Sequence, residues 1–226
     1  MRVSVVMAAF NAEAYLAEAI DSLLGQSRPP DEVIVIDDGS RDRTRAILEQ
    51  YGARIRSISQ SNAGQATALN RALAIAGGDV LGFCDADDLW TPHKLERQAA
   101  CLQASADIDA VFGQVRQFVS PDVPPERRDG MRPAIEVLNG ETKLCLLIRR
   151  VAFDRVGPFD ETLPATFFIE WLGRGKQRGL RYLMLDEIVA LRRLHVGNGG
   201  RTNARSQDQE TLLALRQVIA GRRTPP

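Results

Sequence analysis

The chain has 226 residues, of which 44% are hydrophobic and 26% are charged, so it can form the core of one large or two small soluble domains. Its 29 basic and 29 acidic residues give a net charge of zero, which excludes a global field that would attract nucleic acid or an anionic membrane. Three cysteines without metal-ligand spacing predict free thiols in a reducing compartment. No apolar stretch reaches the roughly 18 residues of a membrane span. We therefore expect a cytoplasmic protein with no transmembrane segment, for which peripheral membrane association stays open.

The first 105 residues alternate buried strands with amphipathic helices. Asn11 and Thr91 are expected to cap the helices that follow them, and Pro92 to occupy a first helical position. Alternation of this kind predicts a mostly parallel sheet with right-handed crossovers. The spacing of apolar residues places strands at 2–10, 32–36, 54–58 and 78–84, and helices at 12–24, 44–51, 65–76 and 92–104.

The second half has a mixed α+β texture. Its pattern predicts strands at 109–119, 143–149 and 180–194, a surface loop at 120–133, a turn at 156–161 and a helix at 166–178. Residues 196–200 form a glycine-rich stretch that is expected to be flexible, and Ser206 with Gln209 resembles a capping box that opens a last helix.

Three carboxylates follow the apolar run that starts at Gly78. Asp85, Asp87 and Asp88 stand where the ligand crevice of an open α/β sheet lies, at the carboxyl end of a strand. If the backbone stays extended there, Asp85 and Asp87 point to one face and can hold Mg²⁺ or Mn²⁺ with positions left for phosphate oxygens. The same residues are also compatible with a solvated turn that ends in a helix cap.

Polar groups also end the second and third predicted strands. Asp37 and Asp38 end the second predicted strand, where a carboxylate could accept a hydrogen bond from the imide N–H of a uracil or hold a ribose, and Gly39 allows a tight turn. Asn62 and Gly64 offer further polar groups, although loop and helix capping explain them equally well. Neither Gly-x-Gly-x-x-Gly after the first strand nor a P-loop is present in the sequence, so dinucleotide and P-loop phosphate sites are not expected.

Five stretches together resemble the glycosyltransferase family 2 proteins of GT-A fold, namely residues 5–16, 22–26, 35–40, 62–64 and 84–88. The resemblance extends from Val3 to about Arg193. It implies an α/β fold of GT-A type, with a mostly parallel, Rossmann-like central sheet flanked by helices and a smaller α+β acceptor-side region. We therefore expect one domain over 1–226, comprising a nucleotide-sugar-binding half (1–105), an acceptor-side half (106–195), and a flexible loop with a C-terminal helix (196–226).

The resemblance also implies an activity. Members are hexosyltransferase-type enzymes that transfer a sugar, with inversion, from a nucleoside diphosphate, usually UDP, to an acceptor hydroxyl. They act in polysaccharide, glycolipid or glycoconjugate synthesis. Mg²⁺ or Mn²⁺ at the Asp-x-Asp motif is the implied cofactor, with Asp87, Asp85 and His195 as its candidate ligands. The residues carried over to the donor are Ala8, Phe10, Asn11, Asp38, Asn62, Gly64, Asp85, Ala86, Asp87, Arg192 and Arg193.

The acceptor side of the resemblance is altered. Family members place a carboxylate pair at the start of a helix after a turn like Gly157–Glu161, whereas here Ile169 precedes Glu170. The resemblance implies Glu170 as the general base. The altered pair keeps open a non-catalytic nucleotide-sugar binding module, and a sugar-phosphate nucleotidyltransferase is a weaker alternative because residues 9–13 lack the expected glycine-rich, basic loop.

Overall fold

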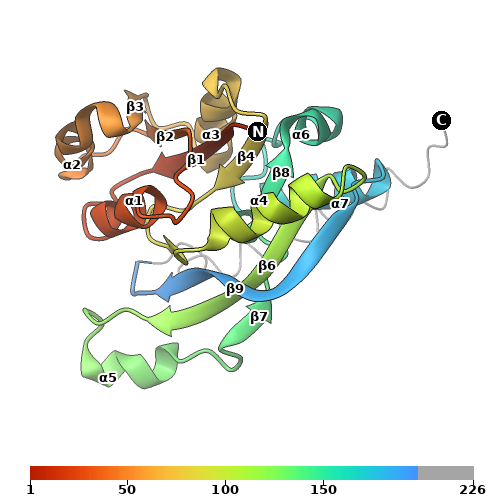
Figure 1. Cartoon of the computed structure of the whole chain (residues 1–226). Coiled ribbons are helices and arrows are strands. Elements are labelled where there is room, and N and C mark those ends of the chain that lie inside the picture. The colour runs from red at the N-terminus through yellow and green to blue at the C-terminus, as the bar shows by residue number, and fades with distance from the viewer. Residues whose placement is uncertain (198–226) are drawn as a thin grey trace.

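The apolar runs of the first half form the centre of a nine-stranded sheet in the computed structural model, which describes residues 1–197 (Figure 1). Nearly all residues of the central strands are buried, as is typical of parallel strands covered on both faces. The strands are β1 (Val3–Ala9), β2 (Glu32–Asp37), β3 (Arg56–Ser59), β4 (Val80–Phe83), β5 (Leu89–Trp90), β6 (Ala110–Val119), β7 (Val137–Asn139), β8 (Leu147–Arg149) and β9 (Tyr182–Leu194).

The strand order is β3-β2-β1-β4-β8-β6-β9-β5, with β7 paired to β6. β3, β2, β1 and β4 run parallel, β8 is antiparallel to both β4 and β6, and β9 runs parallel to β6. β5 and β7 each pair antiparallel with their neighbour. The expected α/β architecture with a mostly parallel sheet is confirmed.

Helices cover both faces of the sheet. Figure 1 shows α1 and α4 in front of the strands and α3 and α6 behind them. The side chain of Gln26, just after α1, ties the two front helices together by accepting the Leu95 N–H and donating to the Thr91 carbonyl. The helices are α1 (Leu16–Leu24), α2 (Thr44–Tyr51), α3 (Gln65–Ile75), α4 (Lys94–Ala104), α5 (Pro125–Arg128), α6 (Arg150–Val156) and α7 (Phe167–Gln177), with short 3-10 turns η1 (Gly52–Arg54), η2 (Asp129–Met131) and η3 (Lys143–Cys145).

An aromatic cluster joins the second half to the sheet. The ring of Phe159 packs edge-on against Phe83 of β4 and Phe153 of α6, and the same ring contacts Trp171 of α7. Centroid separations of 5.4 to 5.8 Å are those of favourable aromatic pairs. The cluster therefore fixes the start of α7 relative to the carboxyl end of β4.

Several local expectations are wrong. Asn11 does not cap a helix: its backbone is left-handed, with φ 47°, its side chain accepts the Arg41 N–H, and α1 begins only at Leu16. Thr91 and Pro92 do not open α4, because the Thr91 hydroxyl instead donates to the Ile188 carbonyl of the paired strand. Of the strand expected over 143–149, only Leu147–Arg149 is extended, and the first part is η3.

The described chain contains no helix that is both long and apolar enough to cross a membrane. The expected flexible loop begins with the last two described residues of the chain, Val196 and Gly197. The remainder of that loop and the helix expected from Ser206 lie outside the described residues.

Candidate functional site

A cavity of about 870 Å³ opens at the carboxyl ends of β1, β2 and β4. Parallel strands place their terminal loops along one edge of the sheet, which is where ligands of open α/β sheets bind. The volume lies within the roughly 300 to 1,000 Å³ common for ligand sites. Ten of the residues expected at the site line this cavity: Ala8, Phe10, Asn11, Asp38, Asn62, Gly64, Asp85, Ala86, Asp87 and His195.

Asp38 is held in place by the loop that follows β3. One carboxylate oxygen accepts from Gln60 Nε2 (2.7 Å) and the Ala63 N–H (2.9 Å), and the other accepts from the Gly64 N–H (2.9 Å). A carboxylate offers about four acceptor positions, so these three bonds leave one for a ligand N–H. Asp38 thus orders the loop and retains one acceptor position at the lining of the cavity.

The loops after β2 and β3 approach closely at Gly39. The Gly39 backbone has φ 78°, and a Cβ built there would lie 2.8 Å from the Asn62 nitrogen. The Asn62 side chain closes the contact by donating to the Asp38 carbonyl at 3.0 Å. The expected tight turn at Gly39 is confirmed. The close contact between the two loops is a second reason why this position requires glycine.

The chain turns immediately after β4, so the condition for a shared face of Asp85 and Asp87 is not met. The strand ends at Phe83, and the Asp88 N–H donates to the Asp85 carbonyl across the turn. Asp85 is contacted by Lys143 Nζ at 2.5 and 2.6 Å and by Gln65 Nε2 at 2.8 Å. Asp87 instead contacts His195 Nε2 at 3.0 Å. The two carboxylates therefore have separate partners.

The Asp87 carboxylate and the His195 imidazole are hydrogen-bonded to each other, and the spacing of the two atoms also suits neighbouring ligands of one divalent ion. Adjacent ligand atoms around an octahedral Mg²⁺ ion, each about 2.1 Å from the metal, are about 3.0 Å apart. The separation of Asp87 Oδ2 and His195 Nε2 is 3.0 Å, and both residues line the large cavity. Within residues 1–197 no three Asp, Glu, His or Cys side chains are grouped to hold a metal, so phosphate oxygens and water would complete such a shell.

Arg193 is buried and does not line the cavity, in contrast to the expected donor contact. It is 3% exposed, its Nε donates to the Asp87 carbonyl, and its guanidinium contacts Glu18 at 2.6 Å. Its backbone N–H donates to the carboxylate of Asp88. Arg193 thereby fixes the turn that carries Asp87.

Asp88 is enclosed beneath that turn and is 5% exposed. Burial, followed by the charges of Asp87 and Asp85, raises the pKa of the Asp88 carboxyl well above its ordinary value. A buried carboxyl of this kind favours its uncharged form, so we assign it a structural part in the turn.

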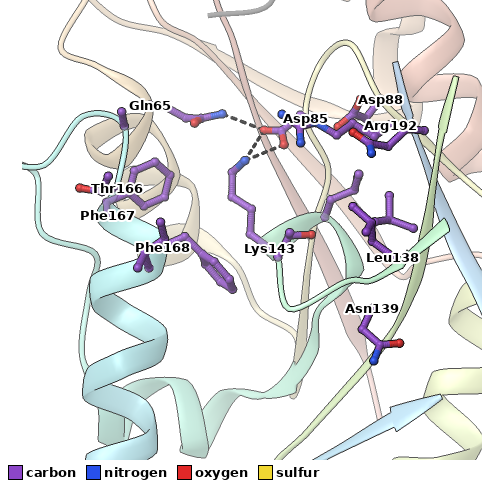
Figure 2. Close-up of a pocket in the computed structure, with 16 residues that line it drawn as sticks. Gln65, Asp85, Asp88, Leu138, Asn139, Lys143, Thr166, Phe167, Phe168 and Arg192 are labelled. Carbon is purple, nitrogen blue, oxygen red and sulfur yellow. Dashed lines mark hydrogen bonds and ion pairs between the residues drawn. The ribbon is translucent and has the colours of Figure 1, made fainter. Parts of the chain in front are cut away.

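A second cavity, of about 430 Å³, shares Gln65 and Asp85 with the first. Figure 2 shows Lys143 reaching up to Asp85 through this pocket, with Phe167 and Phe168 on one side and Arg192 on the other. Arg192, expected near a diphosphate, lines this second cavity and not the large one.

Glu170 lines neither cavity. The first turn of α7 contributes Phe167, Phe168 and Ile169 to the lining of the smaller pocket, whereas Glu170, the next residue, is buried and is not part of that lining. Its two oxygens pair with Arg174 Nε (2.9 Å) and Nη2 (3.0 Å), and Arg174 also donates to the Val156 and Pro158 carbonyls.

Sequence reasoning missed Gln65, Lys143 and Tyr15. Gln65 directly follows the singled-out Gly64, so its position at the start of α3 was a usable signal. Lys143 lies 58 residues from Asp85 on a short 3-10 turn, and no local pattern indicates the pair. The ring of Tyr15, at 4.6 Å from the His195 ring, was assigned only to the apolar face of α1.

Comparison with known proteins gives consistent matches. The family model described as glycosyl transferase family 2 matches residues 4–157. An uncharacterized glycosyltransferase of Rickettsia typhi is 33% identical over 178 residues, covering 73% of this chain and 55% of the relative. TuaG of Bacillus subtilis, a putative teichuronic acid biosynthesis glycosyltransferase, is 43% identical over 100 residues, covering 42% of this chain and 40% of TuaG. The chain spans about half, or less, of these relatives' length.

Solved structures resemble the chain over nearly all its length. S. aureus TarS residues 1–349, in complex with UDP, has a TM-score of 0.74 at 20% identity, covering 97% of this chain and 65% of that one. The mannosyltransferase PcManGT from Pyrobaculum calidifontis, in complex with GDP-Man and Mn²⁺, has a TM-score of 0.72 at 21% identity, covering 100% and 66%. At these identities the likeness establishes a shared fold.

Proposed function

Because the chain belongs to glycosyl transferase family 2 and has the GT-A fold, we propose that it transfers a sugar from a nucleoside diphosphate to an acceptor in the neighbouring pocket. The observation that carries the proposal is the pair of cavities that share Asp85 and Gln65. One has the size and polar groups for a nucleotide, and the other opens beside it. Direct displacement with inversion needs this arrangement, because the acceptor must approach the sugar from the side opposite the departing diphosphate.

The donor end of the proposal places a UDP-sugar in the large cavity. The remaining acceptor position of Asp38 suits the imide N–H of uracil, and Phe10, 51% exposed at the end of β1, offers a ring face to the base. Solved relatives contain UDP, UDP-GlcNAc or GDP-Man, which supports a nucleotide-sugar donor. Uracil is our preferred base because of the single acceptor that Asp38 retains.

Asp87 and His195 are the proposed metal ligands. When bound, Mg²⁺ or Mn²⁺ supplies positive charge beside the diphosphate. The Asp85 carboxylate is paired with the ammonium of Lys143 and accepts a hydrogen bond from Gln65. We propose that Asp85 positions these two side chains, and that they bind the hydroxyls of the ribose or the sugar. Arg193 keeps the Asp87 turn in place from below.

A non-catalytic nucleotide-sugar binding module is the second candidate. The observation that favours it is the ion pair between Glu170 and Arg174, which holds the predicted general base away from both cavities. The general-base role of Glu170 therefore stays a prediction. Slow, Mn²⁺-dependent hydrolysis of UDP-glucose, UDP-GlcNAc or GDP-mannose would support an enzyme, and its complete absence with intact donor binding would support the module.

The proposal is tested by calorimetric titration of UDP with Mn²⁺ or EDTA. Asp87→Asn removes one charged ligand from the ion, so UDP affinity in Mn²⁺ should fall by about tenfold or more, and affinity in EDTA should stay the same. Asp107→Asn, a change at a surface carboxylate paired with Arg181, is the matched control and should bind UDP like the wild type. Equal affinities for wild type and Asp87→Asn in both conditions would exclude the metal bridge.

A further inference from the structure

The imidazole of His195, directly after β9, is closely packed. Its Nε2 lies 3.0 Å from Asp87 Oδ2, the Gly197 N–H donates to its Nδ1 at 3.2 Å, and its ring centroid lies 4.6 Å from that of Tyr15. The side chain is 14% exposed although it lines the large cavity. Asp87 and Gly197 contact the two ring nitrogens, and Tyr15 supplies packing against the ring itself.

Tyr15, the residue before α1, is itself tethered by distant parts of the chain. Its hydroxyl donates to Asp122 Oδ2 at 2.6 Å, the short length typical of a hydrogen bond to a carboxylate. The guanidinium of Arg193 lies 4.7 Å from the centre of the Tyr15 ring and 4.9 Å from the centre of the Phe118 ring. Tyr15 is therefore fixed at its hydroxyl by the segment that follows β6 and at its ring by β9.

The segment 120–131, part of the expected surface loop, packs on the end of β9. Its apolar contact is with Leu194, the residue before His195, in a cluster separate from the large core of the described chain. The other members of this cluster are Val119, Val123 and Met131. The Ser120 N–H also donates to the Leu194 carbonyl at 2.9 Å. The segment thus holds the backbone before His195, and through Asp122 it also holds the Tyr15 ring beside the imidazole.

Building on the proposed metal ligands, we propose that Tyr15, tethered by Asp122, is a positioning residue that keeps His195 Nε2 turned toward Asp87 before the donor arrives. A ligand that is already in place binds an ion without the entropic cost of ordering its side chain. Partners that orient a metal ligand typically contribute about 10- to 100-fold to metal affinity. Asp122 lines neither of the two cavities, so the segment 120–131 supports the donor site from outside.

A purely structural role for the hydrogen bond between Tyr15 and Asp122 makes a different prediction. Breaking the bond would then lower the free energy of unfolding, while the order of the His195 ring and the effect of metal on UDP binding would stay the same. Positioning predicts that both of these properties change in the folded protein. Measurements on the folded protein therefore separate the two roles.

The first test measures the order of the histidine rings without metal. The chain has two histidines, and His93, whose side chain is 64% exposed, serves as the internal reference. We expect NMR relaxation of the ring C–H bonds to show an ordered His195 in the wild type and a clearly more mobile His195 in Tyr15→Leu and Asp122→Ala. Asp122 is exposed, so Asp122→Ala keeps the test available if Tyr15→Leu fails to fold.

Tyr51→Leu is the matched control for lost packing. Tyr51 is also a tyrosine whose hydroxyl bonds a carboxylate, that of Asp21, and it lines neither of the two cavities. Its replacement should leave His195 as ordered as in the wild type. Equal loosening of His195 in Tyr51→Leu and Tyr15→Leu would show a general loss of packing and would overturn the proposal.

The second test is a calorimetric titration of UDP in Mn²⁺ and in EDTA. Tyr15→Leu should reduce the gain in UDP affinity that Mn²⁺ provides by about tenfold, and the affinity in EDTA should stay the same. Tyr15→Phe keeps the ring and breaks the same hydrogen bond as Asp122→Ala. These two variants should therefore show a smaller and similar loss, and the double variant should show no further loss.

The outcomes are separable from failure of the proposed function. If Mn²⁺ gives the wild type no gain in UDP affinity, the proposed metal ligands fail, and ring order measured without metal then decides the positioning role alone. A His195 ring that is as ordered in Tyr15→Leu as in the wild type would overturn that role, and the same result in Asp122→Ala would overturn the tether. A loss of UDP affinity in EDTA as large as that in Mn²⁺ would show that Tyr15 contacts the nucleotide directly, which would also overturn the proposal.

Discussion

Glu170 shows how one residue type can serve two different purposes. As a general base it would face the acceptor, but its carboxylate is 11% exposed and pairs with Arg174 one helical turn away. Arg174 in turn binds the carbonyls of Val156 and Pro158, so the pair secures α7 against the end of α6. The geometry therefore favours a positioning role.

We expect Glu170→Gln to lower the free energy of unfolding by about 1 to 3 kcal/mol, because Arg174 loses a charged partner in a shielded place. The transfer rate per folded molecule should change by no more than a few fold. Thermal unfolding and initial rates measure the two effects. Glu49→Gln is the matched control: Glu49 also pairs with an arginine four residues away, but both are exposed, so its loss should cost under about 0.5 kcal/mol. A hundredfold rate loss at unchanged stability would restore the general-base role of Glu170.

Lys94 is an unusual charged residue for a core position. It is 1% exposed, its ammonium donates to Gln98 Oε1, and it lies 4.7 Å from the centre of the Trp90 ring. Burial lowers the pKa of Lys94 from 10.5 to about 8. The folded state therefore binds fewer protons than the unfolded state between about pH 8 and 10.5, and the penalty for burying the charge is fully present below pH 8.

The corresponding variant is Lys94→Met, which removes the titrating amine and keeps an unbranched side chain of similar length. We expect the free energy of unfolding of the wild type, minus that of the variant, to rise by on the order of 3 kcal/mol between pH 8 and 10.5, because the wild-type penalty disappears as Lys94 loses its proton. Urea unfolding at several pH values measures this difference, and titrations common to both proteins cancel. A difference independent of pH would show that Lys94 titrates normally.

Among single residues, most of those expected around the donor line one cavity, whereas Arg192 and Arg193 do not line it and Glu170 lines neither cavity. Ala8, Phe10, Asp38 and Asp87 follow strands whose apolar runs are unmistakable, so the sheet edge assembles them. Lys143 is brought to Asp85 by a 3-10 turn that looks like a strand in the sequence. Such a meeting depends on tertiary packing, and no local spacing encodes it.

The loops at the carboxyl ends of β2 and β3 act as one element because Gly39 lets them touch. At Gly39→Ala, a Cβ would meet the Asn62 nitrogen at 2.8 Å in addition to the strain of φ 78°. We expect a loss of stability of about 2 to 4 kcal/mol and weaker UDP binding, since the displaced loop carries the donors that hold Asp38.

Gly52→Ala is the control for Gly39→Ala, because it introduces the backbone strain of a positive φ without a steric clash. Gly52 also has a positive φ, 53°, but its Cβ would meet nothing within 4 Å, so the variant should lose only about 1 kcal/mol and bind UDP normally. Thermal unfolding and UDP calorimetry on both variants provide the comparison. Equal losses in the two proteins would show that the loop contact contributes nothing.

Elements with strong periodicity were correctly predicted, and short ones were not. The central strands β1, β2 and β4 and the helices α3 and α7 appear within a few residues of their expected ranges. β5 and β7 have two and three residues and exist because β9 and β6 offer them partners. A strand that short has no pattern of its own, so only the assembled sheet defines it.

We propose that the described chain folds as a single cooperative domain, because the sheet crosses between its two halves twice. β4 of the first half pairs with β8 of the second, and β5 pairs with β9. The chain's two tryptophans, Trp90 in β5 and Trp171 in α7, are both buried and report one half each.

Single-tryptophan variants Trp90→Phe and Trp171→Phe test this cooperativity. In each variant the fluorescence transition in urea should coincide with the loss of circular dichroism, because neither half can unfold while the shared strand pairs remain. Transitions that separate by more than the fitting error in either variant would indicate two independently folding halves.

The shared wall between the cavities bears on how such a protein can diversify. The large cavity draws most of its lining from residues 8–87, and the small one draws most of its lining from residues 115–169. Under the proposed function, mutations in the second stretch can therefore change the acceptor while the donor preference is inherited intact. Asp85 and Gln65 belong to both linings, so a change at either alters two specificities at once. Among homologues, these two positions should drift most slowly, while Phe168 and Arg192 should vary with the acceptor.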